Sequence, residues 1–180
     1  MKSFYLAAMF AAVLVLAAQP TRARAADKGD VYFGYSRVGA NLYAANTSGM
    51  NGWQAAVHVK PIPFVGIEGD VSHYSQNSNG YSEQVTQAMF GPRVTVHALG
   101  FYLFAHGLGG FLHQNATLTT FPSSSYNAVG YALGGGADLP IFLGLKVRGT
   151  VDYLGNSNEP GAGSRGPQHY RAGVGLAYHF

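Results

Sequence analysis

Few residues of this 180-residue chain have the types and spacing that chemistry needs. His73 and Ser75 place an imidazole and a hydroxyl two residues apart, and Glu83 supplies a carboxylate downstream. A Ser–His–acid set activates a hydroxyl for acyl transfer when the three side chains meet. A histidine and a serine at the edge of a loop usually have no chemical role, so we expect no catalysis from this group.

Metal and cofactor sites are not indicated either. The seven histidines lack the spacing of a metal site backed by carboxylates, and the chain has no cysteine. The glycines of Gly134-Gly135-Gly136 are not followed by the Lys-Ser/Thr of a phosphate-binding loop. We therefore expect no cofactor and no metal.

The N-terminal segment is typical of an exported protein. Lys2 precedes an apolar run over 4–18, and Ala23-Arg24-Ala25 forms a small-x-small cleavage site. That run of fifteen residues is shorter than the ~20 that a membrane-spanning helix needs. We expect residues 1–25 to be a cleaved signal peptide and residues 26–180 to form one domain.

The composition favours a domain that faces lipid. Removing Lys2, Arg22 and Arg24 lowers the eleven Lys and Arg residues to eight, which equals the eight Asp and Glu residues. This balance gives no reason to expect a nucleic-acid partner. Charged residues are 11% of the chain, against roughly 25% in ordinary soluble domains, while aromatic residues are 13%.

The elements that must position these residues are all strands. Segments of about ten residues with period-two patterning are separated by breaks. Long and short breaks alternate along the chain. The eight predicted strands lie near 30–38, 52–60, 63–74, 84–97, 100–114, 126–138, 143–154 and 168–180. The long connections fall at 39–51, 75–82, 115–125 and 155–167, and the short ones at 60–63, 97–100 and 139–142.

This order predicts an all-β fold, an eight-stranded antiparallel up-and-down transmembrane barrel. Pro92 lies inside the fourth strand, where a bulge would accommodate it.

Most strands have one apolar and one polar face. The last strand is the clearest, because its residues alternate without interruption between an apolar or aromatic set and a polar or small set. The fifth strand is ambiguous, since the pattern does not decide whether His106 or Gly107 points inward. Several aromatic residues lie toward strand ends, as membrane interfaces favour: Tyr35, Trp53, Tyr102, Tyr153, Tyr170, Tyr178 and Phe180.

Charged residues share the polar face. They are Lys60, Glu68, Asp70, Arg93, Asp138, Lys146, Arg148, Asp152 and Arg171. In a closed barrel of eight strands this face becomes the interior, which side chains fill and where charges need partners. Three ion pairs are expected to plug the barrel, namely Glu68–Arg93, Asp138–Lys146 and Asp152–Arg171.

The sequence resembles the OmpA-like outer-membrane β-barrel domain proteins of the eight-stranded, small-porin type, over roughly residues 28–180. The segments that carry the resemblance are Val31-Tyr32-Phe33-Gly34-Tyr35-Ser36, Phe90-Gly91-Pro92-Arg93, Ala132-Leu133-Gly134-Gly135-Gly136-Ala137-Asp138, Val151-Asp152-Tyr153-Leu154 and Gly175-x-x-Tyr178-x-Phe180. The last motif resembles the signal read by the barrel-assembly machinery, although Gly173 stands where that signal starts with a polar residue.

The resemblance implies export to the bacterial outer membrane, contact with its lipids and lipopolysaccharide, and a structural, adhesive or narrow-pore role through extracellular loops. A monomer is expected, without the peptidoglycan-anchoring domain of the larger OmpA proteins.

Two alternatives remain at this point. One is an outer-membrane hydrolase similar to the lipid A deacylases, whose His-x-Ser motif His73 and Ser75 resemble. The other is a soluble exported barrel similar to the lipocalins, with the apolar face inside around a small apolar ligand. Residue parity alone does not separate this barrel from a membrane barrel.

Overall fold

The computed structural model describes residues 28–40, 49–78, 81–98, 100–118, 121–157 and 169–180. The predicted signal peptide over 1–25 lies outside these residues. The described elements are the strands β1 (Gly29–Ala40), β2 (Met50–Ile62), β3 (Val65–Ser78), β4 (Tyr81–Ala98), β5 (Phe101–Leu118), β6 (Phe121–Phe142), β7 (Leu145–Ser157) and β8 (His169–His179). Within the described ranges, no helix has the length and hydropathy to cross a membrane.

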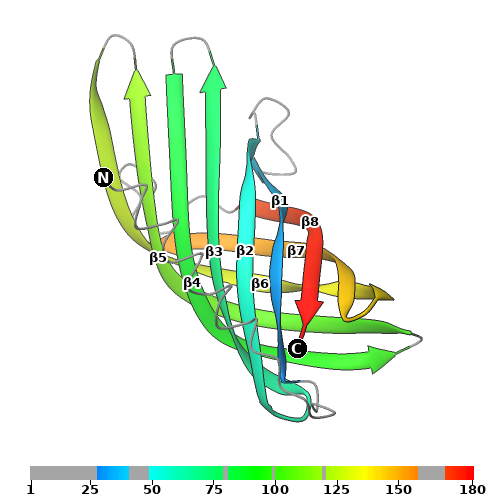
Figure 1. Ribbon diagram of the computed structural model, residues 1–180. Coiled ribbons are helices and arrows are strands. Elements are labelled where there is room, and N and C mark those ends of the chain that lie inside the picture. Colours follow the sequence, from blue (N-terminus) through cyan, green and yellow to red (C-terminus); the bar gives the residue numbers. More distant parts are fainter. Residues whose placement is uncertain (1–27, 41–48, 79–80, 99, 119–120, 158–168) are drawn as a thin grey trace.

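The strands form one closed antiparallel barrel in chain order (Figure 1). The barrel closes where β8 pairs with β1 over the register from Asp30↔His179 to Ala40↔His169. The predicted fold, an all-β up-and-down barrel of eight strands, is therefore confirmed. Every predicted strand is present, and most are longer than expected; β6 in particular runs over 121–142 where the sequence predicted 126–138.

One end of the barrel, which we call the turn end, has tight connections. They lie at Pro63–Phe64, around Gly100 and at Leu143–Gly144, and the chain ends there at Phe180. Gly100 and Gly144 have φ of 83° and 82°. Glycine adopts this left-handed conformation without steric cost, which is why these turns can be so short.

At the opposite end, which we call the hairpin end, two of the predicted connections are wrong. The polar segments 75–82 and 115–125 are not long loops, because β3 pairs with β4 up to Ser78↔Tyr81 and β5 pairs with β6 up to Leu118↔Phe121. The two hairpins rise beyond the rest of the barrel (Figure 1). Their Ser, Asn and Gln residues indicated contact with water and were therefore predicted to form loops. Strand pairing uses backbone N–H and C=O groups, however, and so does not require apolar side chains. The other two predicted long connections fall largely at 41–48 and 158–168, outside the described residues.

The strand accommodates Pro92 without a bulge. The register between β4 and β5 is the same on both sides of it, from Phe90↔Gly109 to Arg93↔His106, and the ladder omits only the two residues between. Because proline has no N–H, leaving out a rung accommodates it without an extra residue. The register shifts that do occur lie at 59–62, 116–118 and 140–142.

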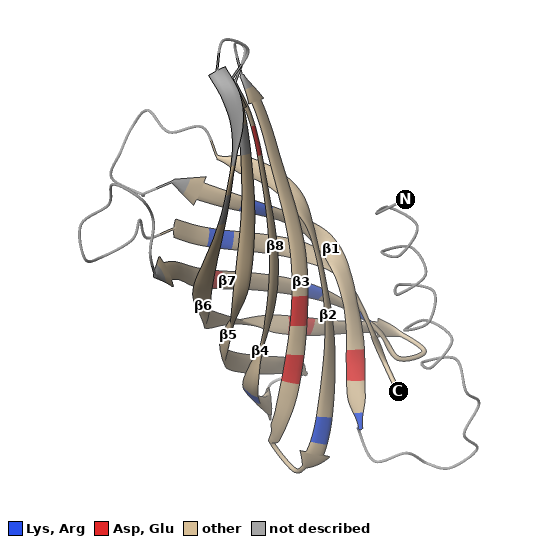
Figure 2. Ribbon diagram, turned by 90° about the vertical axis from the view of Figure 1, so that its left-hand side faces the viewer, with Lys and Arg blue, Asp and Glu red and all other residues tan. Residues whose placement is uncertain are grey.

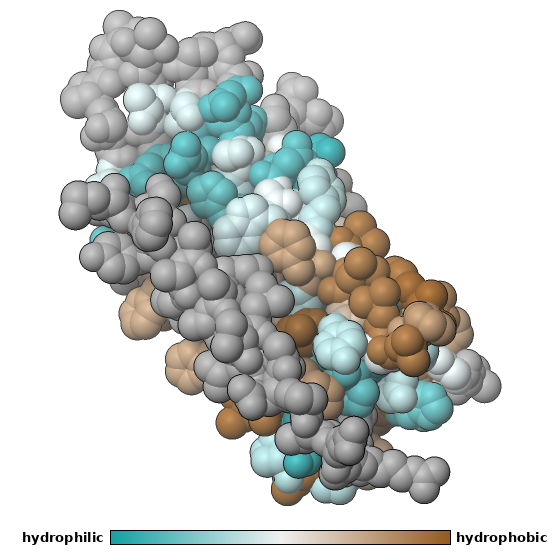
Figure 3. Space-filling model, viewed as in Figure 1, coloured by the Kyte–Doolittle hydropathy of each residue, from teal (hydrophilic) through white to brown (hydrophobic). Residues whose placement is uncertain are grey.

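The two faces of the wall differ sharply in polarity. Large apolar side chains point outward, with Phe90 68% and Phe111 70% exposed, while Glu68 is 2% and Arg171 0% exposed. Figure 3 shows the resulting apolar band on the barrel wall, with a hydrophilic region above it. Soluble proteins have the reverse arrangement, so the parity that a lipocalin-like barrel requires is excluded. On β5, His106 points inward and Gly107 outward.

Candidate functional site

The barrel interior contains two layers of different chemistry. The ionic layer consists of Asp30, His58, Glu68, Asp70, Arg93, His106, Asp138, Arg148, Asp152 and Arg171, all of them buried. The apolar layer consists of Tyr74, Val85, Met89, Leu108, Leu112, Ala128, Ala132 and Leu154, also buried. The apolar layer lies closer to the hairpin end, and Figure 2 accordingly shows most charged positions below the tall hairpins.

One half of the ionic layer is built around two arginines. Arg93 Nη1 lies 2.8 Å from Glu68 Oε2 and 3.5 Å from Asp30 Oδ1. Arg148 donates from Nε and Nη2 to the two oxygens of Asp138, at 2.6 and 2.7 Å, and also from Nη2 to Asp30 Oδ1 at 2.7 Å. The paired donation to one carboxylate matches the fixed fork of a guanidinium and is the strong form of this interaction.

The other half is built around Arg171 of β8. Its Nε donates to Asp152 Oδ2 at 2.6 Å, and its Nη1 donates to Asp70 Oδ1 at 2.9 Å. Gln54 donates to the second oxygen of Asp70 at 2.6 Å. The neighbouring strands β7 and β8 are thus tied to β3, which is distant along the chain.

His106 joins the two halves. Its Nδ1 lies 3.0 Å from Glu68 Oε1 and its Nε2 lies 2.8 Å from Asp152 Oδ1. Since a carboxylate only accepts, both ring nitrogens must carry hydrogen, and the imidazole is a cation in this arrangement. The histidine is therefore as much a part of the network as the arginines.

The charge count of the layer agrees with a protonated His106. Among described side chains that are buried, the carboxylates are Asp30, Glu68, Asp70, Asp138 and Asp152, against the cations Arg93, Lys146, Arg148 and Arg171. With the positive charge of His106, these side chains have five charges of each sign. Charges that are paired and sum to zero can fill a lumen in which isolated charges would be too costly.

The aromatic ring of Phe104 lies within the ionic layer as well. The Arg93 guanidinium carbon is 3.8 Å from the ring centroid, and that of Arg148 is 4.9 Å away. Two cations can share one ring because each interacts with its negatively charged π face. Phe104 thus contacts both arginines of this half of the layer.

The expected pairings differ from the structure in detail. Glu68 binds Arg93, but its backbone partner is Gly91, so the side chains meet diagonally. Asp138 lies opposite Arg148 in the register and binds it, two residues beyond the expected Lys146. Asp152 lies opposite Arg171 and binds it, as expected.

The two lysines on the predicted face lie at the edge of this network. The ammonium group of Lys146 is 3.9 Å from the ring centroid of Tyr102. Tyr102 occupies an inward position next to Phe104 and so does not belong to an outer aromatic belt as predicted. Lys60 is half-buried near the end of β2.

Sequence reasoning left four participants out of the network, Asp30, Gln54, His58 and His106, although alternation puts Gln54 and His58 on the polar face of their strand. Asp30 was not assigned to a face, although it lies two and six residues from the inward Tyr32 and Ser36 and therefore shares their face of the strand. His58 Nδ1 lies 3.2 Å from Asp30 Oδ2, directly across the β1–β2 register. Because the predicted connection over 39–51 is long, it leaves the register of β1 and β2 open, and this contact could not be read from the predicted strand bounds.

The possible hydrolase residues do not form a site. His73 and Ser75 occupy outward positions on β3, and His73 Nδ1 lies 3.0 Å from Thr86 Oγ1. Glu83 occupies an inward position on β4, where Gln114 donates to it at 2.6 Å. The imidazole and the carboxylate are thus on opposite faces of the wall. In the part of the chain that the structure describes, no group of three His, Cys, Asp or Glu residues could hold a metal ion.

The predicted assembly residues lie on the strand that closes the barrel. Tyr178 and Phe180 are exposed on the outer wall at the turn end. Gly175 faces Gly34 across the β1–β8 seam, and a Cβ atom at Gly175 would collide with the backbone of Phe33 and Gly34. A glycine at this position allows the first and last strands to approach closely.

No family model matches the sequence, and no curated protein matches it. The fold, however, is similar to those of several solved bacterial barrels. Neisserial surface protein A superimposes with a TM-score of 0.66 at 7% identity, covering 84% of this chain and 96% of that chain. Outer membrane protein OprG from Pseudomonas aeruginosa gives a TM-score of 0.62 at 11% identity, covering 86% and 96%.

Ail, the attachment invasion locus protein of Yersinia pestis, gives a TM-score of 0.61 at 16% identity and covers 86% of this chain and 100% of that chain. At these identities the likeness concerns the fold alone. It agrees with the type of fold that the sequence resemblance implied.

Proposed function

We propose that this chain is an integral protein of the bacterial outer membrane. The lumen of its barrel is occluded, and its tall hairpins extend to the cell surface. The observation that carries the proposal is the inverted polarity of the wall, with bulky apolar side chains outside and paired charges inside. On β5 the outward residues from Phe101 to Phe111 are all apolar or glycine. That stretch matches the ~9–11 residues that a tilted strand needs to cross the hydrocarbon core.

The proposal includes a route of export and assembly. Residues 1–25 have the pattern of a signal peptide, and the closing strand β8 ends in the exposed aromatic residues Tyr178 and Phe180. We propose that the barrel-assembly machinery reads this strand together with Gly175. In this arrangement the turn end faces the periplasm and the hairpin end faces outward, as in bacterial barrels with short periplasmic turns.

A structural or adhesive role is better supported than an open pore. The lumen is filled at one level by the ionic layer and at another by the apolar layer, so ions would have to displace both. The hairpins also carry polar, uncharged side chains on their outward positions, among them Ser75, Gln84 and Asn115. Such a surface can form hydrogen bonds with a partner at the cell surface.

The experiment is detergent extraction followed by gel migration with and without boiling, paired with planar-bilayer conductance. We expect recovery in the outer-membrane fraction, compact migration that is lost on heating, and no steady single-channel steps. Recovery in the periplasm without detergent would contradict the membrane assignment. Regular large steps would contradict the occluded lumen while leaving the membrane assignment intact.

A further inference from the structure

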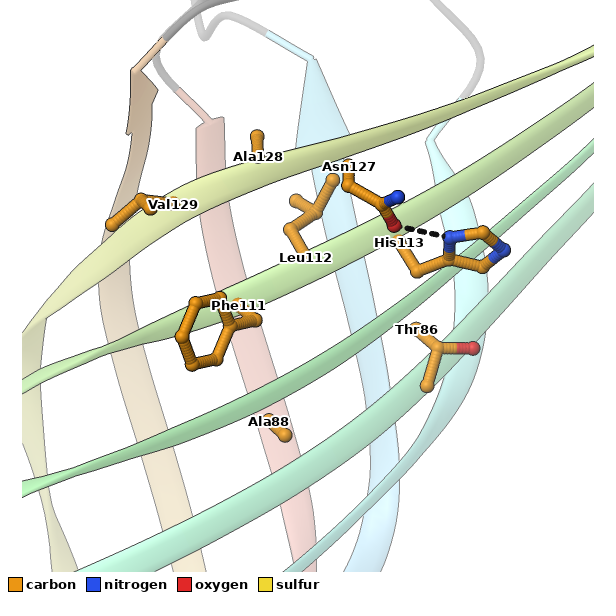
Figure 4. Close-up of a pocket in the computed structure, with 8 residues that line it drawn as sticks. All are labelled: Thr86, Ala88, Phe111, Leu112, His113, Asn127, Ala128 and Val129. Atoms are coloured by element: carbon orange, nitrogen blue, oxygen red, sulfur yellow. Dashed lines mark hydrogen bonds between the residues drawn. The ribbon is translucent and has the colours of Figure 1, made fainter.

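The outer wall of β4, β5 and β6 has a depression. Its volume is about 560 Å³, and its lining changes from apolar residues on the turn side to polar residues on the hairpin side (Figure 4). The outward side chains that line it form two rows across the three strands. Register pairs define the upper row as Thr86, His113 and Asn127, and the lower row as Ala88, Phe111 and Val129.

The lower row is apolar and uneven in height. Phe111 stands out from the wall, while Ala88 beside it is small. Two residues nearer the turn end on the same strand, Gly109 leaves open space, since nothing lies within 4 Å of where its Cβ would be. Its register partners, Phe90 on β4 and Tyr131 on β6, are bulky and exposed. An elongated apolar chain could therefore lie over Gly109, between these two rings and below Phe111.

The upper row offers hydrogen-bond donors. His113 Nδ1 lies 2.6 Å from Asn127 Oδ1, so the imidazole donates and the amide oxygen accepts (Figure 4). The amide hydrogens of Asn127 therefore remain as donors, and so does Nε2 when His113 is protonated. His73 extends the row, because it pairs with Thr86 across β3 and β4.

The charge distribution around the depression favours an anion. Every Asp and Glu among the described residues occupies an inward position on its strand. An anionic group on the outer wall would thus meet two histidines and no carboxylate in the described part of the barrel. A phosphate group accepts several hydrogen bonds and suits such a row of donors.

We propose that the depression and the open space at Gly109 next to it together bind lipid A, the phosphorylated acyl glycolipid of the outer leaflet, with one acyl chain over Gly109 and one phosphate at His113 and Asn127. The inference rests on the proposed membrane function, which places the hairpin end of the apolar band at the outer leaflet. The inference adds one specific lipid-binding site on one side of the barrel, whereas the proposed function alone implies uniform contact with lipid around the wall.

The test uses native mass spectrometry of the full mature barrel, released from detergent micelles that contain bisphosphorylated, hexa-acylated lipid A. We expect the wild-type protein to retain one lipid A molecule. Gly109→Leu should lower retention about tenfold, because the new side chain fills the space of roughly two methylene groups of the acyl chain. His113→Ala should lower it as well, and dephosphorylated lipid A should be retained less than the phosphorylated form.

Matched controls isolate the site from the fold. Gly149 on β7 also faces outward with nothing within 4 Å of its Cβ position, so Gly149→Leu makes the same chemical change elsewhere on the wall. His97→Ala removes a histidine near the turn end, where its ring is tilted against that of Tyr102. Both control variants should retain lipid A like the wild type.

Two outcomes would overturn the inference: equal retention by the Gly109→Leu and Gly149→Leu variants, or preferential retention of phosphatidylglycerol over lipid A. Heat-sensitive gel migration of each variant shows separately whether the barrel has folded. If the wild-type protein itself failed to enter membranes, the proposed function would fail; if it entered them and the variants did not differ, only the lipid A site would fail.

Discussion

The ionic layer and the apolar layer occupy the same barrel but hold it together by different means. In the ionic layer Arg93, Arg148 and Arg171 each contact two or more carboxylates, and their guanidinium groups have fixed geometry. In the apolar layer Met89, Leu108, Ala132 and Leu154 pack without directional contacts.

Removing one partner of a buried ion pair leaves a charge without compensation, whereas an apolar core adapts to changes that conserve volume. The ionic layer should therefore tolerate substitution least. The following variants test that difference.

The largest effect is expected from charge reversal in the ionic layer. Glu68→Lys would place an ammonium between Arg93 and His106, which now contact Glu68 at 2.8 and 3.0 Å. We expect a loss of at least ~5 kcal/mol in the free energy of unfolding, or no folding at all. The measurement is the urea concentration at which the compact gel band disappears. Lys28→Glu, a reversal at an exposed residue, is the control, and an equal response of the two variants would contradict the account.

Removal of a single cation should have the next largest effect. Arg171→Met leaves Asp70 and Asp152 without their arginine, and we expect a loss of about 3–5 kcal/mol. Adding Asp152→Asn to this variant should cost less than the sum of the two single substitutions, with a coupling of about 1–3 kcal/mol. Strict additivity in the urea titrations would mean that the two side chains do not act as a pair.

Truncation in the apolar layer should have a smaller effect. Leu108 is buried against Met89, Ala132 and Leu154, and Leu108→Ala would leave a cavity among them. We expect a loss of about 2–4 kcal/mol in the same urea titration. A cost above that of Arg171→Met would reverse the order of the two layers.

Conservative substitutions give the smallest effects and the sharpest contrast. Arg148→Lys loses the paired donation to Asp138, and we expect a loss of about 2 kcal/mol. Leu108→Met keeps the volume of the side chain and should cost less than about 1 kcal/mol. Thermal unfolding followed by gel migration compares the two, and equal costs would show that geometry matters no more in one layer than in the other.

The sequence predicted the faces of the wall better than the contacts inside it. On β2, β3, β6, β7 and β8, simple alternation separated inward from outward residues, since lipid and lumen demand opposite polarity. Contacts depend in addition on the register, and a shift of two residues preserves every face while it changes the partner. For that reason Asp138 was placed on the correct face but assigned Lys146 in place of Arg148.

The fifth strand shows where alternation fails. Its inward positions include Phe104, Leu108 and Leu112, which are as apolar as its outward Leu103 and Phe111. Strand β5 contributes to both interior layers, so its two faces do not differ in hydropathy. For this reason the sequence could not decide that His106 points inward, although His106 joins both halves of the ionic layer.

The central claim is that the apolar face of the wall meets lipid while the charged face is sealed inside. The chain contains no cysteine, so a spin label on one introduced cysteine reports a single position. With labels at Leu133 and Leu176 in reconstituted membranes, the account predicts frequent collisions with oxygen, which dissolves in acyl chains, and few with a water-soluble nickel complex. Frequent collisions with the nickel complex at both positions would place this face in water and contradict the account.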